Sequence, residues 1–254
     1  MNLITDHKER WKTATVLLFI VAIVGVLNNH FITWLFLAAV YMIAFYEAQM
    51  LLGAKDSNTF AYAVSIWIIA GFYPHASDII FLALIVFAAK LAYFKSDDIQ
   101  EFLPILYPTA GMLFTWMLYL GYGMASLVWM LVIVAFTDVG AFFVGKSIGK
   151  TSFSPTSPNK TLEGVAGGII SATVIGAIVG ASILNISFFT ALLISLISSI
   201  FSIFGDLFES YIKRKAKVKD SGTILPGHGG ILDRIDGYLF ASISLYILLK
   251  IAGN

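Results

Sequence analysis

Long apolar stretches recur along almost the whole chain and constrain its fold more than any other feature. A helix needs about 20 mostly apolar residues to cross a hydrocarbon core of about 30 Å. Stretches near this length occupy residues 13–27, 31–51, 59–73, 77–94, 103–120, 124–145, 164–184, 187–205 and 236–252. Charged residues make up only 12% of the chain, against roughly 25% in an average soluble protein. We therefore predict an all-α integral membrane protein with about nine transmembrane helices.

The positions of the basic residues predict the orientation of these helices. If the N-terminus is cytoplasmic and the chain crosses nine times, every one of its 16 Lys and Arg residues except Lys250 falls on the cytoplasmic side. Such a bias is what the positive-inside rule describes. The first apolar stretch is followed by no small-residue cleavage site, so we expect an uncleaved signal-anchor helix. The sequence thus predicts a multi-pass protein of the cell (inner or plasma) membrane with a cytoplasmic N-terminus.

Polar residues outside the N-terminus gather mainly in two segments of the predicted cytoplasmic side, 145–164 and 206–236. The predicted loops on the opposite side are very short. We therefore expect residues 1–123 to supply N-terminal transmembrane helices and residues 124–254 to form a C-terminal transmembrane region that carries most of the polar residues. Both belong to one continuous membrane domain in this interpretation, and the C-terminal half forms a polar site that faces the cytoplasm.

Two polar residues in or beside the first of these segments each allow two interpretations. Asp138 lies inside an apolar stretch, where a carboxylate costs about 2.5 kcal/mol or more at the bilayer centre and by default suggests function. Alternatively, it lies close enough to the interface to reach water or a lysine. Lys160 precedes a predicted helix, whose N-terminus is suited to binding phosphate. On this loop alone we favour the alternative, in which Thr161 caps that helix and Glu163 lies in its first turn.

The eighth apolar stretch predicts a helix whose polar residues share one face if it continues beyond residue 205. The residues on that face are Asp206, Glu209, Ser210 and Lys213. They combine two carboxylates, a hydroxyl and an ammonium group; the alternative is a solvated helix end with a Glu209–Lys213 pair. For Lys215 and Lys217, which follow, we favour contact with anionic lipid headgroups.

The segment KDSGTILPGHGGILDRID, residues 219–236, places basic groups, glycines and acids together before the last apolar stretch. Its notable residues are the Pro226–Gly227 turn, the Gly229–Gly230 pair, and the carboxylates of Asp233 and Asp236. Such a loop suits a metal-bound polyphosphate, because Mg²⁺ takes oxygen ligands while bases and backbone amides bind the other phosphate oxygens. The chain has no cysteine, which excludes thiolate ligands. Lipid anchoring alone would need the bases but not the acids.

Residues 210–236, SYIKRKAKVKDSGTILPGHGGILDRID, closely resemble the signature of phosphatidate cytidylyltransferases, also called CDP-diacylglycerol synthases. The upstream blocks DVGAFFVGKSIGK, SPNKTLEGVAGG and GDLFES are also similar to this family, so the resemblance covers the C-terminal half. One departure is TSFSPTSP, near which the family more often has a second basic residue. The resemblance implies an all-helical, usually dimeric membrane enzyme that makes CDP-diacylglycerol and pyrophosphate from CTP and phosphatidate with Mg²⁺. It implies membrane lipid as a partner and no nucleic acid.

The resemblance also implies roles for individual residues. Asp206 and Asp233 are expected to ligate the metal. The residues expected to act in catalysis are Asp206, Asp233, Lys213, Lys219, Asp236 and Asp138. Those expected to bind CTP or phosphatidate are Lys160, Ser210, Arg214, Gly227, His228, Gly229, Gly230 and Arg234. His228 either donates a hydrogen bond to the pyrophosphate or braces the turn.

Two other functions are compatible with parts of the sequence. One is a different membrane CTP-dependent transferase, acting on an isoprenoid lipid or a lipid alcohol. The other is a proton-coupled transporter, in which Asp138 and Glu47 would relay protons. A transporter predicts broken helices at the midplane and an internal repeat. Here the polar groups gather near one membrane face and the sequence shows no repeat, which favours the transferase.

Overall fold

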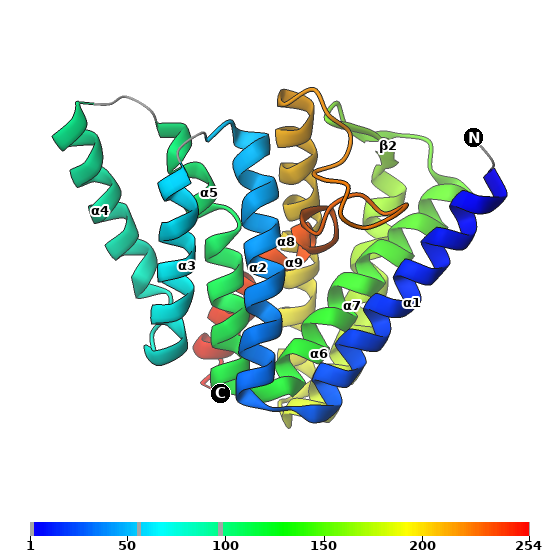
Figure 1. The fold of residues 1–254 in the computed structure, drawn as a ribbon. Helices are drawn as coiled ribbons and strands as arrows, with labels where there is room; N and C mark the ends of the chain where they lie inside the picture. The colour runs from blue at the N-terminus through cyan, green and yellow to red at the C-terminus, as the bar shows by residue number, and fades with distance from the viewer. Residues whose placement is uncertain (1–2, 55–56, 96–98, 254) are drawn as a thin grey trace. The chain divides into compact units, whose positions relative to one another are not determined.

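The computed structural model describes residues 3–54, 57–95 and 99–253. Lys55, one of the basic residues assigned to the cytoplasmic side, lies outside them. The helices, in chain order, are α1 (Leu3–Leu27), α2 (His30–Leu52), α3 (Ser57–Phe72), α4 (Asp78–Phe94), the short 3₁₀ helix η1 (Ile99–Glu101), α5 (Leu103–Leu106), α6 (Thr109–Ile148), α7 (Leu162–Leu184), α8 (Phe188–Lys215) and α9 (Leu232–Ile251) (Figure 1). Apart from one short hairpin and a single β-bridge between Leu225 and Gly229, the regular secondary structure of the described residues is helical.

Within the described ranges, four segments are long and apolar enough to cross a membrane. They are His30–Leu52, Ile99–Ile148, Leu162–Leu184 and Phe188–Lys215. Shorter apolar helices occupy Trp11–Leu27 and Asn58–Phe72. Many large apolar side chains on these helices are exposed, such as Phe72, Phe143 and Phe189, as contact with lipid tails requires. The chain is therefore a helical membrane protein, while the count of nine crossings stays a prediction.

The helix boundaries differ from the predicted apolar stretches at the start of α1 and between α5 and α6. Helix α1 begins at Leu3, well before residue 13, because Lys, Glu and Arg are good helix formers and hydropathy marks only the apolar part of a helix. The fifth stretch is divided between α5 and α6, with Pro108 between them. Inside α6, Gly123 adopts φ 70° and ψ −170°, which glycine tolerates best. This break lies where the sequence predicted the loop after residue 120.

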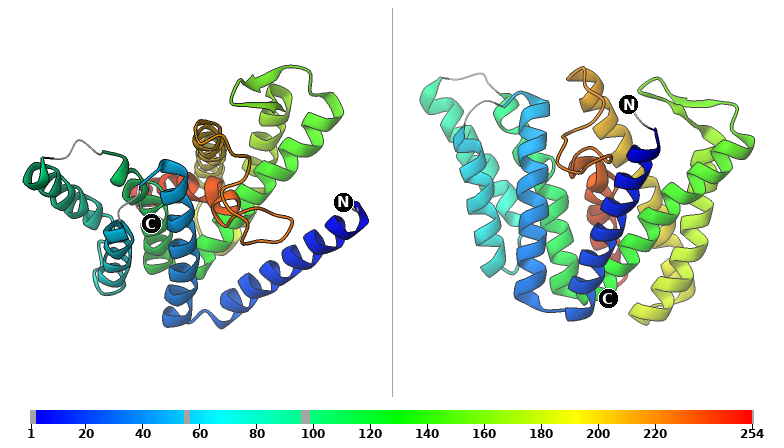
Figure 2. Two further views of the ribbon diagram at one scale, coloured as in Figure 1. Left: turned by 45° about the horizontal axis from the view of Figure 1, so that its top comes forward. Right: turned by 45° about the vertical axis from the view of Figure 1, so that its right-hand side comes forward.

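A two-stranded antiparallel hairpin, β1 (Ser152–Ser154) and β2 (Ser157–Thr161), joins α6 to α7 (Figure 2). The sequence had predicted an irregular loop here, because the strands are short and polar and contain Pro158, a residue disfavoured inside sheets. Thr161 ends β2 and caps α7 by accepting a hydrogen bond from the Gly164 amide, and Glu163 lies in the first turn. Both features of this helix start were predicted.

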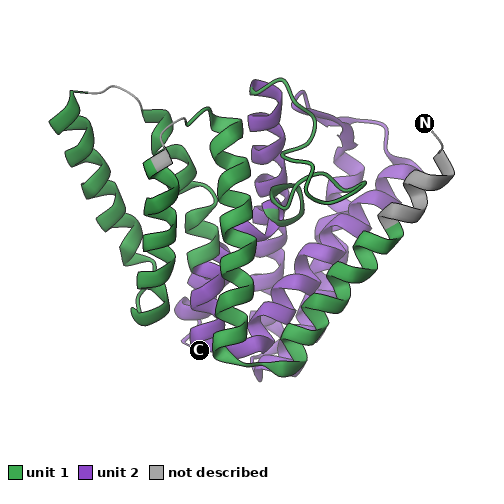
Figure 3. Ribbon diagram, viewed as in Figure 1, with its two compact units in different colours: residues 1–113, 216–235 green, residues 114–215, 236–254 purple. Residues whose placement is uncertain are grey.

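The chain divides into two compact units (Figure 3). Unit 1 comprises residues 1–113 and 216–235, and unit 2 comprises residues 114–215 and 236–254. The loop with the glycine motif therefore packs with helices of the N-terminal half. The predicted division after residue 123 within one membrane domain stays a prediction.

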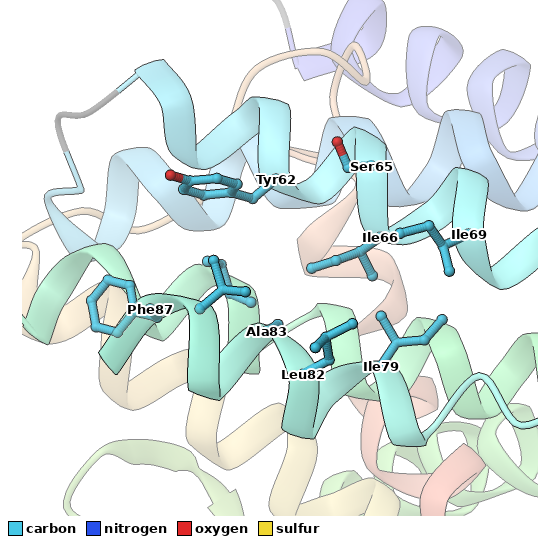
Figure 4. A pocket seen from close by; sticks show the side chains of 10 residues that line it. Tyr62, Ser65, Ile66, Ile69, Ile79, Leu82, Ala83 and Phe87 are labelled. Atoms are coloured by element: carbon cyan, nitrogen blue, oxygen red, sulfur yellow. The ribbon is translucent and has the colours of Figure 1, made fainter. Parts of the chain in front are cut away.

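Unit 1 is built around buried aromatic side chains of α2 and α3. Tyr41 and Trp67 pack with ring centroids 5.2 Å apart, and the Tyr41 hydroxyl lies 2.7 Å from the Thr109 hydroxyl. Between α3 and α4 lies an apolar groove of about 530 Å³, including its open part (Figure 4). Its lining includes Ile66 and Leu82. This groove is apolar and therefore suited to contact with lipid tails. It offers few polar groups that could bind a polar substrate.

Unit 2 packs α6, α7 and α8 closely by means of small residues, as is common between membrane helices. The indole Nε1 of Trp129 on α6 donates a 2.7 Å hydrogen bond to the carbonyl of Gly176 on α7. A Cβ at Gly180 would collide with the same indole, and a Cβ at Gly168 would lie 2.5 Å from the carbonyl of Thr137. These close approaches fix the helices that carry the polar residues of this unit.

Candidate active site

Helix α8 continues beyond residue 205 as far as Lys215 and places the predicted polar residues on one face. Lys213 Nζ lies 2.5 Å from Glu209 Oε2, one helical turn away. The Glu209 side chain is fully buried. A carboxylate is costly to bury unless it is paired, so Glu209 is not part of a solvated helix end. Its burial indicates a built polar site instead.

Three carboxylates form a cluster in unit 2: Asp206 and Glu209 from α8 and Asp236 from α9. Each offers one oxygen atom, and these oxygens lie within 4.8 Å of one another. The two helices pack so closely that a Cβ at Gly205 would collide with the Asp236 carbonyl. Asp236 Oδ1 also accepts a 2.8 Å hydrogen bond from the Gly237 amide. Oxygen ligands in such a group suit a hard divalent cation.

Two lysines face this acid cluster. Lys160, on β2, forms an ion pair with Asp206, and Lys213 forms one with Glu209. Burial lowers the pKa of Lys160, and the nearby Asp138 carboxylate opposes this effect. The site therefore combines three carboxyl groups with two ammonium groups. Because the carboxyl groups outnumber the ammonium groups, the site is suited to binding a further cation, and the two lysines are suited to contacting phosphate.

Asp138 and Lys160 also line a cavity of about 360 Å³. The walls come from α6, the hairpin, the start of α7, and Ile203 of α8. Ligand pockets commonly enclose about 300–1,000 Å³. Asp138 is exposed in unit 2. This carboxylate, which would be costly to place inside a bilayer, therefore faces a space that a polar ligand can enter.

In unit 1, the glycine loop closes around the carboxylate of Asp233. Its Oδ2 atom accepts hydrogen bonds from the Ser221 amide (2.8 Å), the Ser221 hydroxyl (2.9 Å) and the Gly230 amide (2.7 Å). Arg234 donates from Nη2 and Nε to the His228 carbonyl, at 2.9 and 3.2 Å. Asp233 was predicted to bind metal and Arg234 to bind phosphate. Both residues thus also stabilise the conformation of the loop.

The glycines of this loop are required by its backbone. Gly227 and Gly229 have φ values of 74° and 84°, which residues with a Cβ rarely adopt. The His228 amide donates to the Leu225 carbonyl and the Gly230 amide to Asp233, so two of the amides proposed for phosphate contacts are engaged within the loop. His228 Nδ1 is buried without a hydrogen-bond partner among the described residues. Both roles predicted for His228, a hydrogen bond to pyrophosphate and bracing of the turn, stay predictions.

The structure groups the predicted residues by unit. Unit 2 holds Asp138, Lys160, Asp206, Ser210, Lys213, Arg214 and Asp236. Unit 1 holds Lys219, Gly227, His228, Gly229, Gly230, Asp233 and Arg234. Lys219 and Arg214 are exposed. The roles assigned to these residues stay predictions.

Sequence reasoning undervalued two buried acids. Glu209 was placed on the polar face of α8 but was not proposed as a metal ligand, although it belongs to the acid cluster. Glu47, on α2, was considered only for proton relay in a transporter. It is buried and accepts hydrogen bonds from the loop at Ser221, Ile231 and Leu232. A lone carboxylate inside an apolar stretch was the available signal, since such residues rarely lack a role.

The geometry and the sequence relationships together define the class of protein. The chain matches the sequence model of the Cytidylyltransferase family over residues 8–252. It belongs to this family and is a membrane nucleotidyltransferase.

The relatives narrow the class further. Phosphatidate cytidylyltransferases of Helicobacter pylori strains J99 and 26695 are 42% and 41% identical over 244 residues, covering 96% of this chain and 92% of each relative. The enzyme of the same name from Bacillus subtilis is 51% identical over 132 residues, which are 51% of this chain and 49% of that relative. The similarity to the first two extends through the N-terminal helices as well.

Proposed function

We propose that the chain is a phosphatidate cytidylyltransferase, which transfers the cytidylyl group of CTP to phosphatidate and yields CDP-diacylglycerol and pyrophosphate for phospholipid biosynthesis. The observation that carries this proposal is the match to relatives of that name over 96% of the chain. The cluster of carboxylates and lysines in unit 2 supplies groups suited to this chemistry.

The reaction is an in-line substitution at phosphorus. An oxygen of the phosphatidate monoester attacks the α-phosphorus of CTP. The bond from that phosphorus to the oxygen that bridges the α- and β-phosphates breaks. Pyrophosphate leaves with the electron pair. A phosphate monoester has a second pKa of about 6, so the nucleophile is already anionic at neutral pH and needs no general base. Catalysis then rests on positioning and on neutralising the charges of two anions that must approach each other.

The residues of unit 2 divide this work between binding the phosphates and holding a cation. Lys160 and Lys213 provide ammonium groups that can donate hydrogen bonds to phosphate oxygens. The three carboxylates of the acid cluster, Asp206, Glu209 and Asp236, fit Mg²⁺ because it is bound through oxygen ligands. When bound, Mg²⁺ would neutralise phosphate charge and orient the leaving group. A part for Asp233 in metal binding rests on the family resemblance, and its hydrogen bonds support a role in shaping the loop.

We also propose that the N-terminus and the site are cytoplasmic in a cell-membrane protein with about nine crossings. The distribution of basic residues supports this orientation, since nine crossings would place all Lys and Arg residues except Lys250 on the cytoplasmic side. The substrates give a reason for it, because CTP is cytoplasmic and phosphatidate stays in the leaflet. The family resemblance supports a homodimer, and the proposed partners, CTP, phosphatidate and membrane lipid, include no nucleic acid.

Pyrophosphate release by the purified protein tests the proposed function. In detergent, we expect release from CTP only when both phosphatidate and Mg²⁺ are present. Diacylglycerol and an isoprenyl phosphate in place of phosphatidate serve as matched lipids for the alternative transferase and should support little release. Turnover with CTP alone, or the absence of turnover with phosphatidate, would contradict the assignment. Protein-dependent proton flux in vesicles without any CTP turnover would favour the transporter.

A further inference from the structure

Glu47 on α2 holds the start of α9, although the two are far apart in sequence. Its side chain is buried, with 5% of the residue exposed. Oε1 accepts from the Ile231 amide at 3.1 Å, and Oε2 accepts from the Leu232 amide at 2.7 Å. We infer that Glu47 is a positioning residue for cytidylyl transfer, acting through the glycine loop and the first turn of α9. This inference rests on the proposed function for the reaction it supports.

The first amides of a helix have no partners within it and need acceptors from elsewhere. At the start of α9, four consecutive amides are satisfied by side chains. Asp233 accepts from Gly230, Glu47 accepts from Ile231 and Leu232, and the Ser221 hydroxyl accepts from the Asp233 amide at 3.3 Å. A negative charge here also interacts favourably with the helix dipole. Glu47 thus supplies two of the four acceptors.

Ser221 joins the two carboxylates at this helix start. Its hydroxyl lies 3.1 Å from Glu47 Oε2 and 2.9 Å from Asp233 Oδ2. One hydroxyl proton cannot serve both acceptors fully, so the three side chains form one shared network. A change in Glu47 should therefore alter the setting of Asp233, a residue predicted to act in catalysis.

Two glycines provide the space for the Glu47 carboxylate. A Cβ at Gly222 would lie 2.5 Å from Oε1, and a Cβ at Gly230 would lie 2.5 Å from Oε2. Gly230 is the second glycine of the HGG motif. Its small size is explained by the approach of the Ser221 hydroxyl and of this carboxylate, in addition to any approach of a phosphate.

The loop has a further tie to the N-terminal helices through α1. The Thr13 hydroxyl donates a 3.1 Å hydrogen bond to the Pro226 carbonyl. Residues of α1 and α2 therefore fix the loop at its turn and at its junction with α9. This arrangement gives N-terminal helices a part in the reaction, beyond their anchorage in the membrane.

Glu47→Gln tests the inference because glutamine keeps the size of the side chain but replaces one acceptor oxygen by an NH₂ donor. An unsatisfied buried amide and the loss of the charge should lower kcat/KM for CTP by at least about tenfold. Hydrogen exchange should also become faster at the amides of residues 230–232. We expect Ser221→Ala to act in the same direction, and the effects of the two changes to be non-additive because the side chains share a hydrogen bond.

Glu101→Gln is the matched control. Glu101 is also a buried carboxylate of unit 1, but it accepts its 2.6 Å hydrogen bond from the Thr59 hydroxyl. This control should leave kcat/KM within about threefold of the wild type and should not change exchange at residues 230–232. Equal effects of Glu47→Gln and Glu101→Gln would overturn the inference. If Glu47→Gln does not fold, unchanged loop exchange in Ser221→Ala would overturn it. An inactive wild-type protein would instead refute the proposed function, while the exchange measurement would still test the loop contacts.

Discussion

Replacing Asp206 by asparagine is expected to lower kcat for CDP-diacylglycerol formation by about 10²–10³-fold. The substitution keeps the shape of the side chain but removes its charge. Asp206 belongs to the acid cluster and pairs with Lys160, so the variant would lose both a proposed cation ligand and the partner of a lysine that we propose to bind phosphate. Stabilisation by a metal is worth several kcal/mol in the transition state, and each 1.36 kcal/mol corresponds to a factor of ten in rate.

The measurement is the initial rate at saturating CTP and phosphatidate over a range of Mg²⁺ concentrations. We expect the Mg²⁺ requirement of Asp206→Asn to move to higher concentration along with the loss of rate. Asp78→Asn is a suitable control, because Asp78 is an exposed acid at the start of α4 and should retain activity within about twofold. If Asp206→Asn kept most of the activity, the acid cluster would not be the metal site.

Replacing Lys160 by alanine is expected to lower kcat/KM for CTP by about 30- to 100-fold. Lys160 lines the cavity beside Asp138 and reaches Asp206 from the hairpin. Hydrogen bonds to charged groups contribute about 1.5–3 kcal/mol, and an ammonium group facing phosphates also reduces the repulsion between the two substrates. Lys160→Arg should recover part of the loss, since arginine keeps the charge but differs in shape.

Lys217→Ala is the matched control for Lys160→Ala. Lys217 is an exposed lysine of the basic run after α8, where we expect contact with anionic headgroups. Its replacement should change kcat/KM by less than about threefold in detergent. Steady-state kinetics with CTP as the varied substrate distinguishes the two lysines. Similar losses in both variants would show that Lys160 has no special place in the site.

Local sequence rules predicted the parts of the site that lie within one helix. The 3.6-residue period placed Asp206, Glu209 and Lys213 on one face, and α8 continues far enough to confirm this. Cap chemistry predicted the start of α7 at Thr161. Both predictions succeed because the interacting residues are at most seven positions apart, so the helix geometry alone fixes their relation.

The contacts that join distant segments could not be predicted in this way. Lys160 meets Asp206 through the packing of the hairpin against α8, and the hairpin itself was missed because its polar strands resemble a loop. Glu47 meets residues 174 to 185 positions later in the chain. The sequence showed that a membrane carboxylate needs a partner, but only the fold identifies the amides of residues 231 and 232 as that partner.

The central claim is that the cytidylyl group passes from CTP to phosphatidate, and the fate of the labelled phosphates of CTP tests it most directly. With CTP labelled at the α-phosphate, phosphatidate and Mg²⁺, label should enter the chloroform-extractable lipid in amounts equal to the pyrophosphate released. With CTP labelled at the γ-phosphate, the label should stay in the aqueous phase as pyrophosphate. Lipid labelled from the γ-phosphate, or lipid without label from either position, would contradict the account.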